Sequence, residues 1–267
     1  MELTTRYGLE FNPFIKNARE ILFEGVEYKE ALFRLDYLAR TKGFGLLTGS
    51  PGRGKTTAVR NWSKALNPSL YKVVYSSLST VTVNEFYRSL AAALGAQPAY
   101  RKTENFSAIQ SAVTRLALDR KKTPVIIIDE ANYVSNAVLN DLKILFNFEM
   151  DSRDRAVILL VGLPQINTTL QLSIHEPLKQ RIIMNYNLDG FSKDEAREYI
   201  DRKLHGAGCS QTIFDDSAME AIINASDGTA RMINKYCNSS LVIGNSQEAS
   251  VITAELVMQA VNDCELG

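Results

Sequence analysis

The sequence has few of the residues from which metal centres and disulfide frameworks are built. It contains three cysteines and two histidines in 267 residues. Cys209, Cys237 and Cys264 are scattered and form no C-x-x-C pair, which argues against a zinc site or a disulfide framework and favours the reducing cytoplasm. The two histidines, His175 and His205, are too few for a histidine-based metal centre.

Long apolar runs and an excess of charge of either sign are also lacking. The longest apolar run, Ala156–Val161, is far shorter than the ~20 residues that span a bilayer, so we expect no membrane segment. The 30 basic residues balance the 30 acidic ones, which argues against a strongly basic nucleic-acid module. Any contact with DNA must therefore come from a local patch.

One motif in the sequence carries a specific chemistry. Residues 49–56 follow the pattern G-x-x-x-x-G-K-[ST] of the phosphate-binding P-loop. In this motif backbone N–H groups surround an anion, Lys55 reaches the β- and γ-phosphates, and the Thr56 hydroxyl ligates Mg²⁺. The alternative is a glycine-rich turn with a solvated lysine, but an apolar run precedes the loop and a helical pattern follows it, as the motif requires. The predicted nucleotide-binding residues are Gly49, Ser50, Pro51, Gly52, Arg53, Gly54, Lys55, Thr56 and Thr57.

A second motif supports the first. The β-branched run Val125–Ile128 is typical of a buried parallel strand, and two carboxylates follow it directly. Because ligands sit at the carboxyl ends of such strands, Asp129 is expected to hold Mg²⁺ opposite Thr56. Glu130 is expected to polarise the water that attacks the γ-phosphate. The alternative, two acids that open a turn, loses weight beside a P-loop, and the two motifs together predict Mg²⁺-dependent ATP hydrolysis.

Short apolar runs alternate with helical patterns up to about residue 190, and only helical patterns follow. Strands are expected at 44–48, 71–75, 125–128, 156–162 and 182–188, with helices near 31–38, 57–66, 83–94, 105–121 and 136–147. Further helices are expected at 192–204, with Ser192 as the N-cap, and at 215–225, 229–243 and 253–262. This alternation predicts a parallel α/β sheet domain at 1–190, with an N-terminal segment and helix at 1–42, followed by a small all-helical domain at 191–267.

The order of these parts resembles the AAA+ ATPases, in which a P-loop α/β domain precedes a helical lid. Further segments, in chain order, resemble the ExeA/GspA type of this family. They are Tyr7-Gly8-Leu9 with Asn12-Pro13-Phe14, Val161-Gly162-x-Pro164, Leu178-x-Gln180-Arg181-Ile182, and Gly228-x-x-Arg231-x-Ile233-Asn234. The same ATPase type includes the helpers of DNA transposition, in the TniB, TnsC and MuB-like groups, which the chain resembles most in architecture.

The resemblance implies roles for further residues. Arg181 matches the arginine finger that reaches the γ-phosphate of a neighbouring subunit, although a surface arginine at a helix end is the alternative. Arg231 matches sensor 2 of the lid, or else a helix-capping arginine. Phe11, Pro13 and Phe14 match the segment that lines the adenine, or else pack in the core. A polar sensor 1 is expected after the strand at 156–162, but Leu163 stands there, and Gln165 is the nearest substitute.

Local basic clusters are the candidates for contact with DNA. Arg101-Lys102 is expected in a loop, where the resemblance to transposition helpers would place a DNA-gripping segment. Arg120-Lys121-Lys122 follows a predicted helix, where cations offset the macrodipole, and Arg153-x-Arg155 is a third cluster. A solvated loop is the alternative for Arg101-Lys102, and for residues 120–122 the alternative is that these cations only offset the macrodipole.

The resemblance implies an ATPase, with ATP and Mg²⁺ as cofactors, that is slow until DNA or a partner stimulates it. We expect a DNA transposition helper that assembles as a homo-oligomeric ring or filament on double-stranded DNA without strong sequence preference. It would recruit a DDE-type transposase and disassemble on hydrolysis. One alternative is an ExeA-like ATPase of envelope secretion. That class usually continues into a membrane span and a wall-binding region, which the sequence does not contain after the lid. Another alternative is a nucleotide-switched scaffold or replication-loading module.

Overall fold

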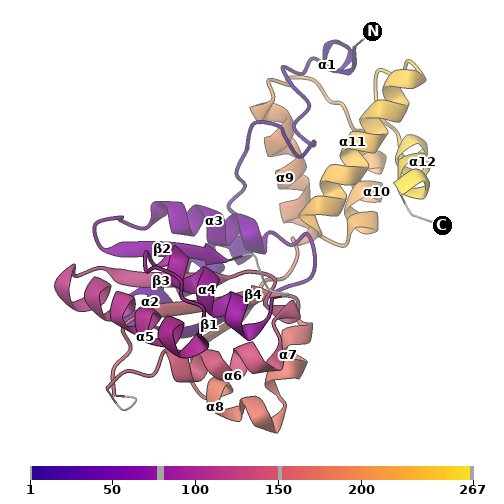
Figure 1. Cartoon of the computed structure of the whole chain (residues 1–267). Helices are drawn as coiled ribbons and strands as arrows, with labels where there is room; N and C mark the ends of the chain where they lie inside the picture. Colours follow the sequence, from indigo (N-terminus) through magenta and orange to yellow (C-terminus); the bar gives the residue numbers. More distant parts are fainter. Residues whose placement is uncertain (1, 77–80, 150–151, 265–267) are drawn as a thin grey trace. The chain divides into compact units, whose positions relative to one another are not determined.

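The computed structural model describes residues 2–76, 81–149 and 152–264 of the chain. Contacts divide the chain into two compact units, Tyr28–Leu188 and a second unit that combines Met1–Glu27 with Asp189–Gly267 (Figure 1). This division differs from the predicted one, which placed residues 1–42 with the sheet. The difference arises because Tyr7, Leu9 and Phe14 are buried in the same hydrophobic cluster as the C-terminal helices.

The first unit is built on a five-stranded parallel sheet, as the alternating pattern predicts. Its strands are β1 (Gly43–Thr48), β2 (Tyr71–Ser76), β3 (Thr123–Ile128), β4 (Val157–Gly162) and β5 (Ile182–Asn187). Their order across the sheet is β2-β3-β4-β1-β5, and every neighbouring pair is parallel. All five carboxyl ends therefore lie on one edge of the sheet, where ligands bind in such folds. The strands that carry the P-loop and the two acids, β1 and β3, are separated by β4.

Helices cover both faces of this sheet (Figure 1). Side chains of β3 alternate between the two cores, with Ile126 and Ile128 on one face and Val125 and Ile127 on the other. The first face packs against α4 (Val83–Ala93), α5 (Lys102–Thr114) and α6 (Asn136–Leu145), and the second against α2 (Val26–Thr41) and α3 (Lys55–Ala65). This double burial explains why β3 is continuously apolar.

The helix predicted at 105–121 has different limits in the structure. It starts at Lys102 and ends at Thr114, where a π-helical turn, η1 (Arg115–Asp119), continues it. The buried side chain of Asn105 binds both the N–H and the carbonyl of Ala99, at 2.8 and 3.0 Å, and so fixes the segment before the helix. The predicted loop position of Lys102 is therefore wrong, because this residue begins α5.

A buried histidine joins α6 to the segment between β4 and β5. This segment contains α7 (Gln165–Leu170), a short 3-10 turn, η4 (Ser173–His175), and α8 (Glu176–Lys179). The His175 ring is fully buried, with Nδ1 at 3.0 Å from Asn140 Oδ1 and Nε2 at 2.9 Å from Asn136 Oδ1. Burial lowers the pKa of His175 below its usual value. A neutral ring has one N–H, so one of the two amides must present its nitrogen.

In the described part of the second unit there are four longer helices and the short α1 (Leu3–Arg6). The helices are α9 (Lys193–Gly206), α10 (Asp216–Ser226), α11 (Ala230–Ser246) and α12 (Ala254–Cys264). Ser192 is the N-cap of α9, as predicted, and forms a reciprocal capping box with Glu195. The helices enclose one apolar cluster, which residues of the N-terminal segment complete. Within the described residues, no helix combines the length and apolar character needed to cross a membrane.

His175 predicts a pH dependence of stability. Because its pKa is lower in the folded protein, the unfolded chain binds more protons as pH falls through the ordinary histidine value of 6.5. The contribution of the neutral ring to the free energy of unfolding is thus full above pH 6.5 and declines below it. Urea unfolding from pH 8 to pH 5 should show a smaller decline for His175→Gln than for the wild type. The exposed His205 is the control, and an equal slope for His175→Gln and His205→Gln would contradict the assignment.

Candidate functional site

The P-loop connects the buried strand β1 to the N-terminus of α3, as the motif requires. Gly54 is the N-cap of α3 and has φ +96°, a conformation that favours glycine, and Lys55 is the first helical residue. Lys55 Nζ lies over the loop, where it donates to the carbonyls of Gly49 at 2.6 Å and Ser50 at 3.1 Å. The helix N-terminus and the ammonium group thus meet at one place, which suits an anion such as a phosphate.

Asp129 is a buried carboxylate directly after β3, with a relative exposure of 6%. Its Oδ2 accepts a hydrogen bond from the Tyr75 hydroxyl at 2.7 Å and lies 3.5 Å from Thr56 Oγ1. Its Oδ1 accepts the Glu130 N–H at 2.9 Å. These partners are neutral, and no ion pair joins Asp129 to a described cationic side chain. A buried charge without a cation is costly, so the hydroxyl of Thr56 and the carboxylate of Asp129 fit a hard divalent cation such as Mg²⁺.

Glu130 follows in a strained conformation with its side chain exposed. Its φ of 52° and ψ of 39° are left-handed, which is uncommon for a residue with a Cβ. It is the N-cap of the 3-10 turn η2 (Ala131–Tyr133), and its N–H is held by the Asp129 carboxylate. The turn therefore directs two adjacent carboxylates differently, one buried toward Thr56 and one toward solvent. A solvent-facing carboxylate next to a phosphate site can accept a proton from water.

The carboxyl end of β4 lies between the P-loop strand and the acidic strand, where a polar sensor is expected. The amide of Asn132, from η2, occupies this end and accepts the Leu163 N–H at 2.9 Å through Oδ1. A Cβ on Gly162 would lie 2.9 Å from the same oxygen, so glycine permits this close approach. Gln165, the predicted substitute, is the exposed first residue of α7. Its sensor role stays a prediction, and Asn132 is a polar group that the sequence reasoning missed.

Arg181 lies just before β5 and is half-buried within its own unit. Its Nη1 donates to the Lys143 carbonyl at 2.8 Å, and its guanidinium lies 5.7 Å from the centre of the Phe44 ring. Burial lowers the pKa of Arg181. The finger role stays a prediction, and it requires the guanidinium to exchange these contacts for a phosphate.

Arg231 and the predicted adenine-lining residues belong to the second unit. Arg231 is exposed in the first turn of α11. Pro13 and Phe14 are buried, and Phe14 packs edge-to-face against Phe214 with ring centres 6.5 Å apart. Phe11 is partly buried against the same cluster. Core packing thus accounts for the three N-terminal residues, and their nucleotide contacts stay predictions.

Two of the predicted basic clusters are partly neutralised by contacts within the protein. Lys102 forms an ion pair with Asp141 at 2.5 Å and lies over the Tyr87 ring, whereas Arg101 is exposed. Arg155 binds Glu149 and the Thr114 hydroxyl. Contacts of this kind limit what either cluster can offer to a phosphate backbone.

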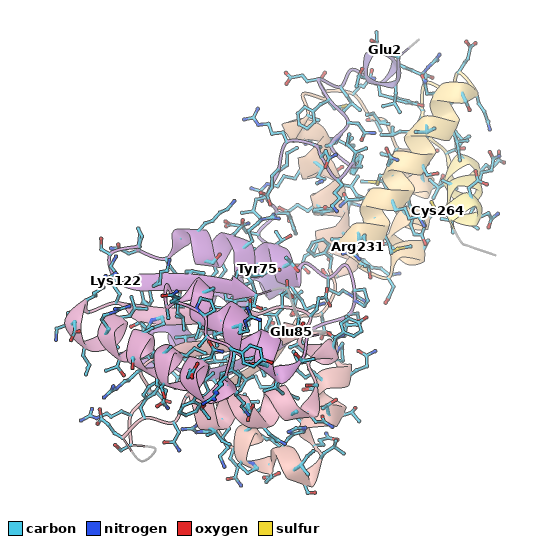
Figure 2. The ribbon with its side chains drawn as sticks, viewed as in Figure 1. Glu2, Tyr75, Glu85, Lys122, Arg231 and Cys264 are labelled. Carbon is cyan, nitrogen blue, oxygen red and sulfur yellow. The ribbon has the colours of Figure 1, made fainter. Side chains whose placement is uncertain are left out.

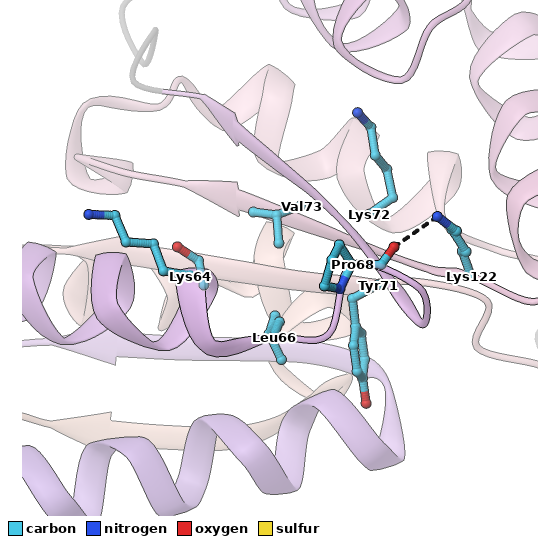
Figure 3. Close-up of a pocket in the computed structure, with 8 residues that line it drawn as sticks. Lys64, Leu66, Pro68, Tyr71, Lys72, Val73 and Lys122 are labelled. Atoms are coloured by element: carbon cyan, nitrogen blue, oxygen red, sulfur yellow. Dashed lines mark hydrogen bonds between the residues drawn. The ribbon is translucent and has the colours of Figure 1, made fainter.

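The cluster Arg120-Lys121-Lys122 gains partners that lie far away in the sequence. A surface groove of about 360 Å³ is lined by Lys64, Lys72 and Lys122, with Pro68 and Tyr71 between them (Figure 3). Lys122 Nζ donates to the Pro68 carbonyl at 2.8 Å, and no ion pair joins these three lysines to the carboxylates that the structure describes. We call Lys64, Lys72 and Lys122 the basic groove. The basic groove lies at the beginning of β2, whereas Tyr75 lies near the end of this strand (Figure 2). The groove is therefore separate from the edge of the sheet that carries the P-loop. Arg120 and Lys121 adjoin Lys122 in sequence.

Comparisons with known proteins match part of the chain to one family and most of it to a curated relative. Residues 38–170 match the AAA domain family. The chain is 30% identical over 244 residues to General secretion pathway protein A of Aeromonas hydrophila, covering 90% of this chain and 44% of that protein. The chain therefore spans less than half the length of that relative.

Solved structures with low sequence identity share the fold. Cdc6p of Pyrobaculum aerophilum has a TM-score of 0.71 at 16% identity, over 96% of this chain and 71% of that one. The ORC structure from Drosophila bound to DNA has a TM-score of 0.72 at 15% identity, over 99% of this chain and 66% of that one. The chain thus has the P-loop AAA+ fold, within which residues 38–170 match the AAA domain family.

The site predicts that two of its charged residues affect different steps, one nucleotide binding and the other hydrolysis. Lys55→Ala should abolish nucleotide binding, because the ammonium neutralises phosphate charge in the ground state. Glu130→Gln should bind ATP as the wild type does but lose hydrolysis, because the predicted role of Glu130 is confined to the attacking water. Calorimetry with ATP and phosphate release under single-turnover conditions measure both. Equal ATP affinity for Lys55→Ala and the wild type would reject the site.

Proposed function

We propose that this AAA+ domain binds and hydrolyses MgATP and uses the cycle as a DNA transposition helper. In the ATP state it assembles on double-stranded DNA and recruits a DDE-type transposase, and hydrolysis releases the assembly. The observation that carries the ATPase part is the meeting of three groups at one edge of the sheet. They are the P-loop with Lys55, the buried Asp129 beside Thr56, and the outward carboxylate of Glu130.

The residues of the chain divide the chemistry of hydrolysis between them. Loop N–H groups and Lys55 hold the phosphates, and Thr56 with Asp129 would hold Mg²⁺, which neutralises charge that develops on the phosphate oxygens. Glu130 accepts a proton from the attacking water. The water oxygen bonds to the γ-phosphorus as the bond to the β-γ bridging oxygen breaks, which releases ADP and phosphate. Asn132 fixes the chain at the end of β4 beside this reaction.

The DNA part of the proposal rests on the basic groove and on the shared fold. Three lysines from α3, β2 and the segment before β3 line one groove, which suits the phosphates of a duplex. The Drosophila ORC structure with the same fold is of that protein bound to DNA. A balanced net charge allows few phosphate contacts per subunit. Useful affinity must therefore come from several subunits that bind together, which links DNA binding to assembly.

A second candidate is an ATPase of secretion, which the identity to General secretion pathway protein A favours. The two candidates differ in one measurable property. A transposition helper should hydrolyse ATP several-fold faster when duplex DNA is added and should bind a transposase in ATP. A secretion ATPase should be indifferent to DNA. ATPase rates with and without an unrelated duplex therefore test the proposal, and an unchanged rate, together with no DNA binding in ATP, would favour secretion.

The role of Arg181 predicts catalysis shared between subunits. Arg181→Ala should bind ATP but hydrolyse it roughly 10³–10⁵-fold more slowly, as arginine fingers do. Because Arg181 is half-buried on Phe44, Arg181→Lys is the matched variant that keeps a cation and much of the stem packing. Mixing Arg181→Ala with Lys55→Ala should restore some turnover, since each subunit supplies the half-site that the other lacks. No rescue, with a monomer by light scattering in ATP, would reject a finger in trans.

The basic groove predicts binding that depends on salt and ATP but little on sequence. The triple variant Lys64→Gln, Lys72→Gln and Lys122→Gln should weaken binding equally on two unrelated duplexes. It should also flatten the slope of log affinity against log salt, by about 0.9 for each DNA phosphate that a lysine no longer neutralises. Fluorescence anisotropy across a salt series, in ATP and in ADP, measures this.

The control for the groove variant loses the same number of positive charges but leaves the basic groove intact. Lys16, Lys29 and Lys193 are exposed lysines elsewhere, and their combined change to glutamine should leave the slope as it is. Arg101→Gln tests the other cluster in the same assay. Equal slopes for the groove variant and the wild type would remove the groove from the DNA site, and equal binding in ATP and ADP would contradict assembly driven by ATP.

A further inference from the structure

Tyr75 lies on the edge strand β2, and its hydroxyl binds Asp129 directly after the acidic strand β3. No sequence motif marks this residue. We propose that Tyr75 is a positioning residue for Asp129: its hydroxyl fixes the carboxylate so that Oδ2 faces Thr56, the orientation in which the pair can hold Mg²⁺. The inference rests on the proposed MgATP site and goes beyond it, because it assigns control of the metal site to a residue of β2.

The hydrogen bonds around Asp129 show what Tyr75 contributes. A terminal carboxylate rotates easily about its last bond, so burial alone does not select which oxygen faces Thr56. The Glu130 N–H binds Oδ1 at 2.9 Å, and the Tyr75 hydroxyl binds Oδ2 at 2.7 Å. Together they fix both oxygens. Thr56 Oγ1, at 3.5 Å, is too far from Oδ2 to do this by itself.

The sheet holds Tyr75 firmly in place for this task. In the parallel ladder, Tyr75 pairs with Ile127 and Ser76 with Ile128, and the Asp129 N–H continues the ladder to the Ser76 carbonyl at 2.9 Å. The backbone of β2 is thus fixed against the residue that Tyr75 contacts. The Tyr75 hydroxyl can act only as the donor in this contact, because an ionised carboxylate only accepts hydrogen bonds.

The Tyr75 side chain lies partly at the surface, and its hydroxyl can be removed while the ring is kept. Tyr75 is 52% exposed, which is unusual for a large side chain with a well-defined contact. Replacement by phenylalanine therefore removes the hydroxyl without leaving a cavity in the core. Lys55 and the loop N–H groups are untouched by this change. The expected defect is thus confined to the contribution that Mg²⁺ makes to nucleotide affinity.

The experiment measures the affinity of the full chain for a non-hydrolysable ATP analogue by calorimetry, once with excess MgCl₂ and once with excess EDTA. The readout is the dissociation constant in EDTA divided by the dissociation constant in MgCl₂. It requires no catalysis. Tyr75→Phe should reduce this ratio about tenfold, because hydrogen bonds to charged groups are among the stronger ones. Its affinity in EDTA should equal that of the wild type.

Two further variants make the result specific. Tyr37, on α2, has the same exposed fraction of 52%, and Tyr37→Phe is the matched control that should leave the ratio unchanged. Asp129→Asn should lower the ratio, and adding Tyr75→Phe to it should cause no further reduction, because Tyr75 acts through Asp129.

Each other outcome overturns a defined part of the argument. An unchanged or larger ratio for Tyr75→Phe overturns the positioning role. Equal weakening in MgCl₂ and in EDTA also overturns it, since Tyr75 would then contact the nucleotide itself. Additive reductions in the double variant would show that Tyr75 does not act through Asp129. A wild type that binds the analogue without any effect of Mg²⁺ rejects the proposed function, and with it the inference.

Discussion

The buried carboxylate of Asp129 is the constraint on which the nucleotide site depends. A negative charge at 6% exposure must be compensated, and the described neighbours offer hydroxyls and an N–H but no cation. A divalent cation beside Thr56 would supply the missing charge. The same carboxylate holds the backbone of Glu130, whose left-handed conformation turns the next acid outward. One buried group thus directs two adjacent carboxylates apart, as the proposed division between metal binding and water activation requires.

Strand order determines how the remaining polar groups reach this site. Because β4 lies between β1 and β3, its carboxyl end is the point where a polar side chain can face both motifs. The strand ends at Gly162 and Leu163 follows it, and neither residue has a polar side chain. The amide of Asn132 reaches this end from the neighbouring turn, and Gly162 leaves room for it. Tyr75 approaches Asp129 from β2, the strand on the other side of β3. Both polar groups therefore come from segments other than the strand end that they contact.

The sequence predicts the parts of this protein that local patterns encode. The P-loop, the acidic strand, the parallel sheet and the Ser192 N-cap follow from residues that are close together in the chain, and the fold confirms them. Pairings between distant residues could not be predicted. Lys102 pairs with Asp141, and Lys64 and Lys72 join Lys122 only through the packing of α3 and β2. Tyr75 could have been suspected, since it ends a predicted strand beside the acidic one, but the pairing of these strands had to be known first.

The N-terminal segment shows how a sequence order can mislead about domains. Lys203, from α9, donates to the Pro13 carbonyl at 2.6 Å and lies 5.8 Å from the centre of the Phe14 ring, and burial lowers its pKa. Asn12 binds Asn238 of α11 at 2.7 Å. These contacts fasten residues 12–14 to the same unit that carries Arg231.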